Sequence, residues 1–316
     1  MNAKITRRQA LLATAGIAAG TLATAQDKKP ADKSWVGLTV LPRSGLVVGR
    51  DTLDEGGGTH HRLTDASYSV KAENGTKAKV LSGVTGVWVE KQEMVPLADA
   101  VAFYDGLIKA NPRDLDAHNF RAWALRLLGK REDAVKGFTD FLALNPYPAY
   151  GLSNRGLTYA ELGKFDEAFK DLEAGAASGR EGWVMAVANT GYAHELRGDF
   201  DKAIAEYKKA VTQGSVLAKN NLAWVRATCP NEKLRDWAEA VKLAKDICDA
   251  TGNEEGMYLD TLAAAYAETG KFDEAVKAQE LAHKDKSYDL AYGDEGRARL
   301  KLYKQKKPFR TEPPRK

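Results

Sequence analysis

Few residues of this 316-residue chain stand at spacings that support catalysis or metal binding. His194 and Glu195 begin an HExxH zinc motif, but the second histidine that the motif requires is missing. The stretch DEGGGTHH could place metal ligands in one loop, although an exposed loop is the simpler interpretation; its candidate ligands are Asp54, Glu55, His60 and His61. The sequence also lacks a phosphate-binding GxxxxGKS/T motif and a GxSxG nucleophile motif. We therefore expect a protein that is not an enzyme, with no catalytic residue, cofactor or metal.

Cys229 and Cys248 are the only cysteines. The pattern places Cys229 in a turn and Cys248 about twelve residues into the following helix, which separates them by roughly 18 Å. That distance is beyond the reach of a disulfide, so we predict two free, buried thiols.

Asparagines at regular intervals are the best candidates for binding. Asn154, Asn189 and Asn221 occupy the same place in three successive copies of a sequence repeat, and each is followed three residues later by a large apolar residue. An amide both donates and accepts hydrogen bonds, so a row of them could hold a peptide backbone with little dependence on its sequence. Alternatively, each Asn forms a bond within its own helical hairpin. The predicted peptide-binding residues are Asn119, Trp123, Asn154, Leu157, Asn189, Tyr192, Asn221 and Trp224.

One short phrase marks the repeat: GKREDA at 129–134, GKFDEA at 163–168, GDFDKA at 198–203 and GKFDEA again at 270–275. The first three copies are 34 and 35 residues apart, which predicts a stack of helical hairpins. The glycine suits the left-handed conformation that ends a helix. Asp166, Asp201 and Asp273 are then expected to cap the helices that follow.

These features resemble the tetratricopeptide repeat family over residues 97–284. In the best copy the matching residues are Pro146, Gly156, Tyr159, Gly163, Phe165 and Ala168; in the last copy they are Leu262, Ala263, Tyr266, Gly270, Phe272, Ala275 and Ala282. The resemblance implies a mainly α fold, a right-handed superhelical α-solenoid, whose concave face is lined by the first helix of each hairpin and holds an extended peptide. Departures from the family pattern occur at Arg180, at Gln279 and in a longer turn around Pro230.

The helical array should occupy residues 98–284, as a half repeat followed by five hairpins. A capping helix is expected at 285–305, with Leu300 and Tyr303 facing inward. The basic end, residues 306–316, is expected to be a solvated tail, or alternatively a contact for an anionic partner.

Residues 35–97 have the composition of short strands and predict a small β-barrel. Its last stretch, GVWVEKQEMVPL, resembles bacterial SH3-like domains, with Trp88 as a core or groove aromatic; this resemblance implies binding of peptides or cell-wall material. Alternatively, the barrel only caps the first half repeat. A hairpin at Asn74 and Gly75 allows two registers, which set Val70 opposite either Ala78 or Lys79. We favour Ala78, because that register separates apolar from charged residues.

Residues 1–25 read as an export signal, with a cationic start, an apolar run and a small-residue cleavage site at 23–25. The stretch 6–12 resembles a twin-arginine signal, while the general secretory route and a retained N-terminal helix are the alternatives. The mature chain should begin near Gln26, with a linker at 26–34, and should lie in the periplasm or another extracytoplasmic space, without stable membrane insertion. Without residues 1–25 it carries 44 basic and 43 acidic residues, which argues against a nucleic-acid partner.

These features predict a non-catalytic exported scaffold or adaptor that binds a protein or an extended peptide in the concave groove of its repeats. The alternative is a cell-envelope accessory protein, whose SH3-like module binds cell-wall peptide or glycan while the repeats recruit another protein.

Overall fold

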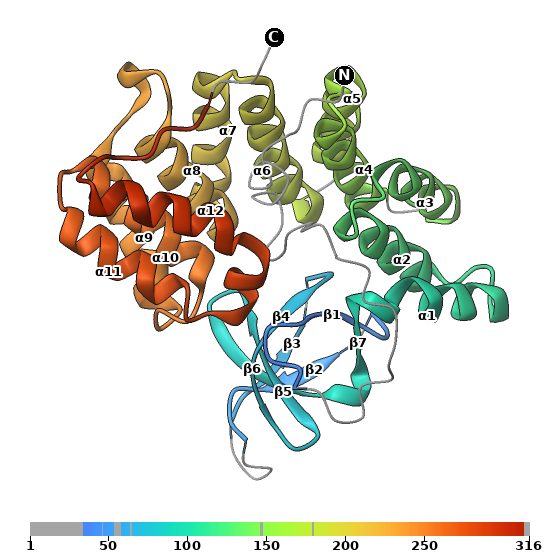
Figure 1. Ribbon diagram of the computed structural model, residues 1–316. Helices are drawn as coiled ribbons and strands as arrows, with labels where there is room; N and C mark the ends of the chain where they lie inside the picture. Colours follow the sequence, from blue (N-terminus) through green and yellow to red (C-terminus); the bar gives the residue numbers. More distant parts are fainter. Residues whose placement is uncertain are drawn as a thin grey trace.

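The computed structural model describes residues 34–45, 47–53, 58–63, 65–145, 148–178 and 180–312. Within them a β-sheet is followed by twelve α-helices, which stack side by side into an arc (Figure 1). Several predictions fall on residues outside this part of the chain: the export signal, most of the 26–34 linker, the loop residues Asp54 and Glu55, Pro146, and the last four residues of the tail.

The sheet has seven strands in the order β3-β2-β6-β5-β4-β1-β7, and every neighbouring pair is antiparallel. The strands are β1 (Thr39–Pro42), β2 (Val48–Arg50), β3 (His60–Arg62), β4 (Tyr68–Asn74), β5 (Lys77–Ser82), β6 (Thr85–Glu90) and β7 (Met94–Pro96). In the described residues the edge strands β3 and β7 do not pair with each other, so the sheet is open. The SH3-like barrel expected from the sequence is therefore not confirmed.

Successive side chains along a strand point to opposite faces of the sheet, and only one face of β6 is buried in the core. Val87 and Val89 of β6 are buried with Val70 and Val80 in one apolar cluster. Trp88 lies between the two valines and therefore points to the other face, where it is only half-buried. Of the two roles expected for Trp88, the core aromatic is wrong, and the groove aromatic stays a prediction.

The β4–β5 hairpin follows neither expected register. Gly75 and Thr76 form its turn, and a bulge at Lys71 shifts β4 so that Val70 lies opposite Val80. Apolar residues still face apolar residues, but the sequence pattern did not indicate the bulge. Because a bulge bends the strand and re-aims a side chain, Lys71 is directed out of the ladder and toward the far end of the helical array.

The helices form hairpins after an initial single helix, α1 (Leu97–Ala110). The first helices of the hairpins, here called the A helices, are α2 (Leu115–Leu127), α4 (Ala149–Glu161), α6 (Arg180–Arg197), α8 (Val216–Thr228) and α10 (Gly256–Glu268). The second helices, the B helices, are α3 (Arg131–Leu144), α5 (Phe165–Ala177), α7 (Phe200–Thr212), α9 (Trp237–Ala250) and α11 (Phe272–Ala282). The last helix is α12 (Lys286–Lys304), and short 3-10 turns occur at Lys91–Glu93 and Glu232–Leu234.

The repeated phrase forms the turn within a hairpin. Its glycine is left-handed in all four copies, with φ between 74° and 90°, as expected from the sequence. The predicted aspartate caps are wrong, because α5, α7 and α11 each begin two residues earlier than a cap at these aspartates would require. Asp166 therefore lies inside the first turn of α5, where it makes no cap hydrogen bond and contributes only through the helix dipole. Side-chain caps occur instead before α2, α8, α9 and α12, from Asp114, Ser215, Asp236 and Asp285.

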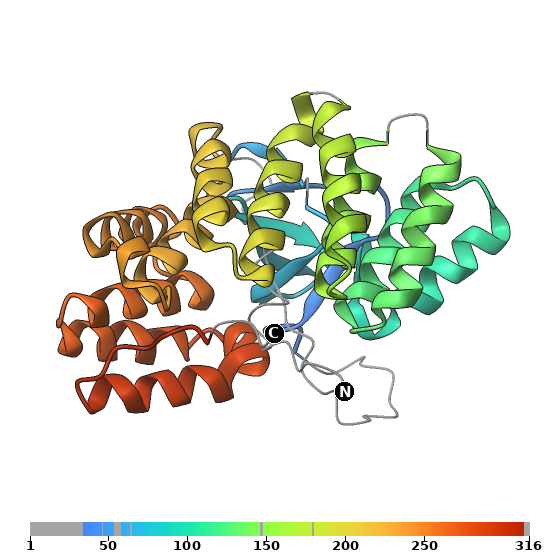
Figure 2. The ribbon, with the colours of Figure 1, turned by 90° about the horizontal axis from the view of Figure 1, so that it is seen from above.

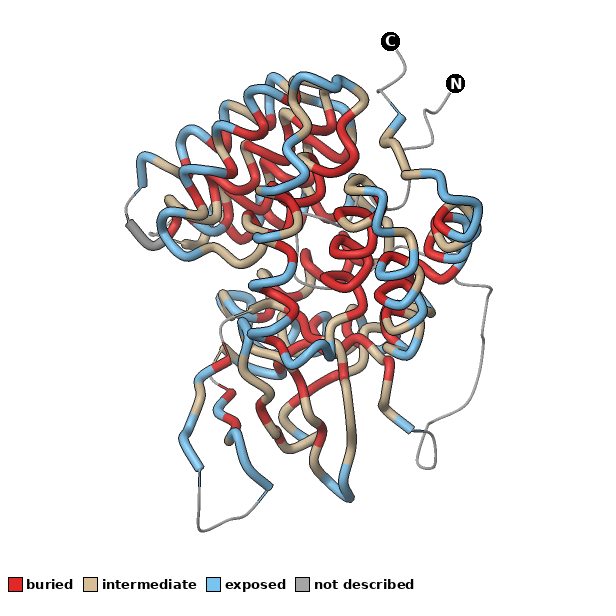
Figure 3. The backbone as a smooth tube through the Cα atoms, turned by 90° about the vertical axis from the view of Figure 1, so that its left-hand side faces the viewer, coloured by how far each residue is buried: buried red, intermediate tan, exposed pale blue. Residues whose placement is uncertain are grey.

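Small residues let the A and B helices of a hairpin approach closely. A Cβ added to Gly156 of α4 would lie 2.8 Å from Leu172 and 3.0 Å from the Ala168 carbonyl oxygen in α5. In the next hairpin a Cβ on Gly191 would lie 2.7 Å from the Tyr207 ring. Figure 3 shows the resulting band of buried residues along the stacked helices, with exposed residues along the outer edges.

The sheet lies beneath the arc and touches both of its ends (Figures 1 and 2). At one end the Tyr104 hydroxyl of α1 donates to the Pro42 carbonyl, and the Gly45 amide donates to the Asp116 carboxylate of α2 at 2.8 Å. At the other end β4 contacts α12. In the described residues no helix is long and apolar enough to cross a membrane.

Candidate binding face and its clamp

The predicted binding residues lie along one stripe of each A helix. In α4 this stripe runs through Tyr150, Asn154, Leu157 and Glu161, at the spacing that keeps side chains on one face of a helix. Asn154, Asn189 and Asn221 are only 1–3% exposed in the full chain. The large residues Trp123, Leu157, Tyr192 and Trp224 are also buried, and Asn119 is half-buried.

Two of the asparagines bond to the preceding repeat. The Asn189 amide of α6 donates to the Ser153 carbonyl of α4 at 3.3 Å. Asn221 of α8 shares a side-chain hydrogen bond with Tyr207 of α7, whose hydroxyl donates to Glu195 at 2.8 Å. The bonds of Asn189 and Asn221 therefore connect successive repeats, whereas the alternative expected each Asn to bond within its own hairpin. A direct role in holding a peptide stays a prediction.

Buried ion pairs join A helices to one another and to the last helix, and the sequence analysis did not predict them. Arg126 of α2 donates two hydrogen bonds to Glu161 of α4, and both side chains are almost fully buried. Asp260 of α10 accepts two bonds from Arg299 of α12, at 2.7 and 3.0 Å. Burial lowers the pKa of Arg299, but Asp260 outweighs it and holds that pKa above its usual range. The partners lie more than thirty residues apart, so only the stacking of repeats reveals them.

The basic end of the chain is not a solvated tail where the structure describes it. Phe309 packs against Trp224 of α8, with ring centroids 5.6 Å apart. Arg310 pairs with Glu268 of α10, and the Thr311 amide donates to the Thr228 carbonyl of α8 at 2.9 Å. The dark red trace in Figure 2 follows this segment away from the end of α12 and across the array. It therefore lies on the A-helix stripe, including one of the predicted binding residues.

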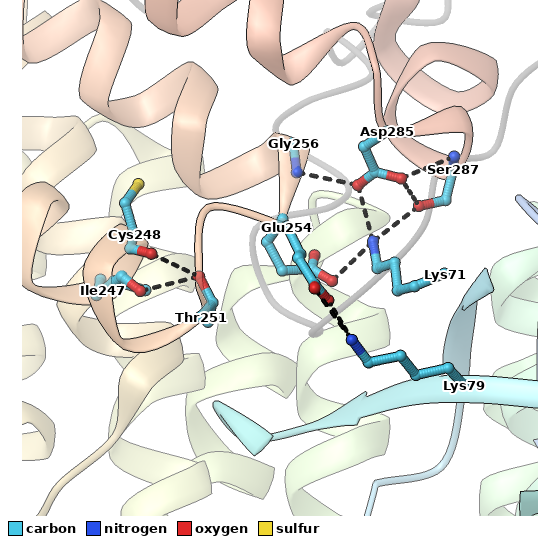
Figure 4. Close-up of polar contacts among 10 residues, drawn as sticks. Lys71, Lys79, Ile247, Cys248, Thr251, Glu254, Gly256, Asp285 and Ser287 are labelled. Carbon is cyan, nitrogen blue, oxygen red and sulfur yellow. Dashed lines mark hydrogen bonds and ion pairs between the residues drawn. The ribbon is translucent and has the colours of Figure 1, made fainter. Parts of the chain in front are cut away.

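A buried charge cluster clamps the sheet to the last repeat (Figure 4). The Lys71 ammonium lies 2.7 Å from Glu255 and 2.7 Å from Asp285, and donates to the Ser287 hydroxyl at 3.0 Å. All three ammonium protons thus have acceptors. The Asp285 carboxylate also accepts from the Gly256 amide at 2.9 Å, so it joins the starts of α10 and α12 to the sheet.

The electrostatics of this cluster follow from burial and from the central cation. Burial lowers the pKa of Lys71, but the two carboxylates outweigh it and hold that pKa above its usual range. Burial raises the pKa of Asp285, but Lys71 outweighs it and the net pKa is lowered. For Glu255 burial is the larger effect, and its pKa is raised. Both carboxylates also lie at helix N-termini, where the helix dipole stabilises a negative charge.

A second carboxyl near this junction, that of Asp65, has a pKa shifted by burial. Asp65 lies just before β4, its backbone amide donates to the Tyr68 hydroxyl at 2.6 Å, and it lies close enough to Tyr258 of α10 to raise the pKa of that tyrosine. Burial raises the pKa of the Asp65 carboxyl to about 6.

The residues considered for chemistry have structural roles. Cys229 and Cys248 are free and buried, and burial raises the pKa of Cys248 to about 12, which leaves its thiol protonated at neutral pH. His194 stacks on Phe169, with ring centroids 4.6 Å apart. His61 lies 3.4 Å from Asp51 in the sheet, and the described residues contain no cluster of three side chains able to hold a metal ion.

Comparison with known proteins agrees with the geometry of the hairpins. Residues 153–218 match the tetratricopeptide repeat family. The matched segment runs from within α4 to the start of α8, so it includes most of the α4–α5 hairpin and all of the α6–α7 hairpin. Over this segment the stacked hairpins therefore resemble a tetratricopeptide repeat solenoid. No curated protein matches the chain in sequence.

The solved structures of Cut9–Hcn1 and Tom70 share the helical fold at low sequence identity. The Cut9–Hcn1 hetero-tetramer of the APC/C matches with a TM-score of 0.52 and 14% identity, over 65% of this chain and 39% of that one. Yeast Tom70 matches with a TM-score of 0.50 and 16% identity, over 65% of this chain and 43% of that one. A tetratricopeptide repeat protein from Parabacteroides merdae matches with a TM-score of 0.49 and 16% identity, over 66% of this chain and 78% of that one.

Replacing Lys71 with Ala should lower the free energy of unfolding by about 3–5 kcal/mol, because it leaves two carboxylates buried without their cation. The matched control is Lys79→Ala, which removes a more exposed pair with Glu254 at the same junction and should cost less than about 1 kcal/mol. Urea unfolding followed by circular dichroism measures both. Equal losses for the two variants would show that the buried cluster does not hold the junction.

Asp65→Asn should stabilise the protein at pH 7.5 but not at pH 4. The folded pKa of about 6 exceeds the ordinary value of 3.8, so the folded state favours the protonated carboxyl. The stability this group provides is complete below the ordinary pKa and is lost as the pH rises through 6. Part of the side chain reaches solvent, so we expect a gain of about 1–3 kcal/mol at pH 7.5. Thermal melts at both pH values measure this gain in stability, and Asp246→Asn, at an exposed position, is the control. A gain that is the same at both pH values would contradict the raised pKa of Asp65.

Proposed function

We propose that this protein is a non-catalytic interaction scaffold, which holds an elongated segment of a partner protein on the A-helix stripes of its array. Tetratricopeptide repeat proteins generally bind protein partners, and the match over residues 153–218 supports the same class of function here. The observation that carries the proposal is the position of Phe309, Arg310 and Thr311, which lie without helix or strand across α8 and α10. This face therefore accepts a peptide segment with both apolar and polar contacts.

The sheet acts as a clamp in this proposal. It contacts α1 and α2 at one end of the arc and α12 at the other, so it fixes the curvature of the helices between them. A face held in one shape loses less conformational freedom when it binds, which favours affinity. This role accounts for both contacts of the sheet without requiring that it bind cell-wall material.

The proposed place of action is outside the cytoplasm. The proposal draws on the cationic start, the apolar run and the small-residue cleavage site in residues 1–25, which lie outside the described part of the chain. The partner would then be an envelope or secreted protein.

Photo-crosslinking tests where the partner binds. Tyr150 is 47% exposed on the A-helix stripe of α4, and Trp237 is 60% exposed at the start of the B helix α9. Each is replaced by the photoreactive aromatic p-benzoylphenylalanine in the full chain, which is then irradiated in envelope extract. Adducts with another protein are expected from position 150 and not from position 237.

The matched positions make the result decisive, since both carry an exposed aromatic that the replacement resembles. Adducts from position 237 alone, or equally from both, would contradict binding on the A-helix face. Mass spectrometry of the adducts would identify the partner.

A further inference from the structure

We propose that the surface formed by Trp224, Thr228, Glu268 and Arg299, here called the seat, recognises a peptide with an aromatic residue, then a basic residue, then a hydroxyl residue. We further propose that the chain's own Phe309, Arg310 and Thr311 occupy the seat as an intramolecular competitor. The inference rests on the proposed peptide-binding role of the A-helix face. It specifies which peptide sequence that face recognises and which segment of the chain occupies it.

The aromatic position is defined by two stacked groups. The Phe309 ring lies 5.6 Å from the Trp224 ring, and the Arg299 guanidinium lies 5.6 Å from the Phe309 centroid and 5.7 Å from the Trp224 centroid. A guanidinium beside two ring systems attracts them through their negative faces. An aliphatic side chain could fill the space but would lose this attraction.

The basic position is defined by a carboxylate that is already oriented. One oxygen of Glu268 lies 2.9 Å from Arg235, and the other pairs with Arg310. Glu268 is largely buried, so its charge is poorly screened by solvent. An acidic residue at the position of Arg310 would be repelled.

The hydroxyl position is defined by the hydrogen bonds of the Thr228 hydroxyl, which has a single proton to donate. The Thr228 hydroxyl donates its only proton to the Trp224 carbonyl at 2.8 Å. Its contact with the Thr311 hydroxyl, also 2.8 Å, therefore requires Thr311 to be the donor. The Thr311 amide satisfies the Thr228 carbonyl, one of the free carbonyls at the end of α8.

The seat should keep its shape when the segment leaves. Arg299 is held by Asp260, Glu268 by Arg235, and the Thr228 hydroxyl by its own helix. Phe309, Arg310 and Thr311 are only half-buried, and a few exposed residues separate them from the end of α12. Such a short tether gives an effective concentration on the order of millimolar, enough to compete with an external peptide.

The test measures the binding of a fluorescein-labelled synthetic peptide, KKPFRTEPPRK, which corresponds to residues 306–316. Fluorescence anisotropy compares the wild-type full chain with the full-chain variants Phe309→Ala and Arg310→Glu, whose own segments should leave the seat. Because the apparent Kd rises as the open fraction falls, both variants should bind the peptide at least about tenfold more tightly than wild type. The full-chain variant Lys307→Ala, at an exposed neighbouring position, should match wild type.

Peptide variants test recognition without changing the protein. Peptides carrying Phe309→Ala or Arg310→Glu should bind at least about tenfold more weakly to the Phe309→Ala chain, and Thr311→Val about fivefold more weakly. The inference is overturned if both chain variants melt like wild type yet bind the peptide no more tightly. It is also overturned if a reversed-sequence peptide binds equally well.

The outcomes separate this inference from the proposed function. Peptide binding at the seat without adducts from position 150 would leave the competitor in place but contradict the wider scaffold role. Adducts from position 150 without peptide binding would keep the scaffold role and remove the competitor.

Discussion

The architecture depends on one buried ammonium group, that of Lys71. It enters the cluster from a bulge in the sheet and meets two carboxylates at the starts of two helices, Glu255 before α10 and Asp285 before α12. A stack of helical hairpins has only nearest-neighbour contacts and is otherwise held at neither end. Here the sheet packs against α1 and α2 and, through Lys71, holds the last repeat as well. The arc is therefore closed by a contact between residues more than two hundred positions apart.

Closing the arc has consequences for the face that would bind a partner. The A-helix stripes are joined by buried bonds between repeats, such as Arg126 with Glu161 and Asn189 with Ser153, so the face is stiff as well as curved. The segment around Phe309 lies on this stiff surface and contacts residues that are held by other partners. A rigid surface with a tethered occupant suits a protein that must bind selectively, because only a segment that outcompetes the occupant gains access.

Local signals in the sequence predicted the local structure well. The glycine of the repeated phrase is left-handed in every copy, and Gly156 and Gly191 lie where two helices touch. The features that the sequence did not reveal depend on tertiary contacts. The bulge at Lys71 is favoured by carboxylates on α10 and α12, the partners of Asn189 and Asn221 come from preceding repeats, and the C-terminal segment gains its order from α8 and α10. The misplaced aspartate caps differ in kind, since a shift of two residues at a helix start is beyond what the sequence pattern alone resolves.

The most direct test of the closed arc is a double-mutant cycle on the clamp. The free energies of unfolding of the wild type, Lys71→Ala, Asp285→Ala and the double variant give the coupling between the two side chains, free of the other bonds that each makes. If Lys71 joins the sheet to the last repeat in solution, the coupling should be about 2 kcal/mol or more. A coupling below about 0.5 kcal/mol would mean that the two effects simply add, and that the arc is not closed through this contact.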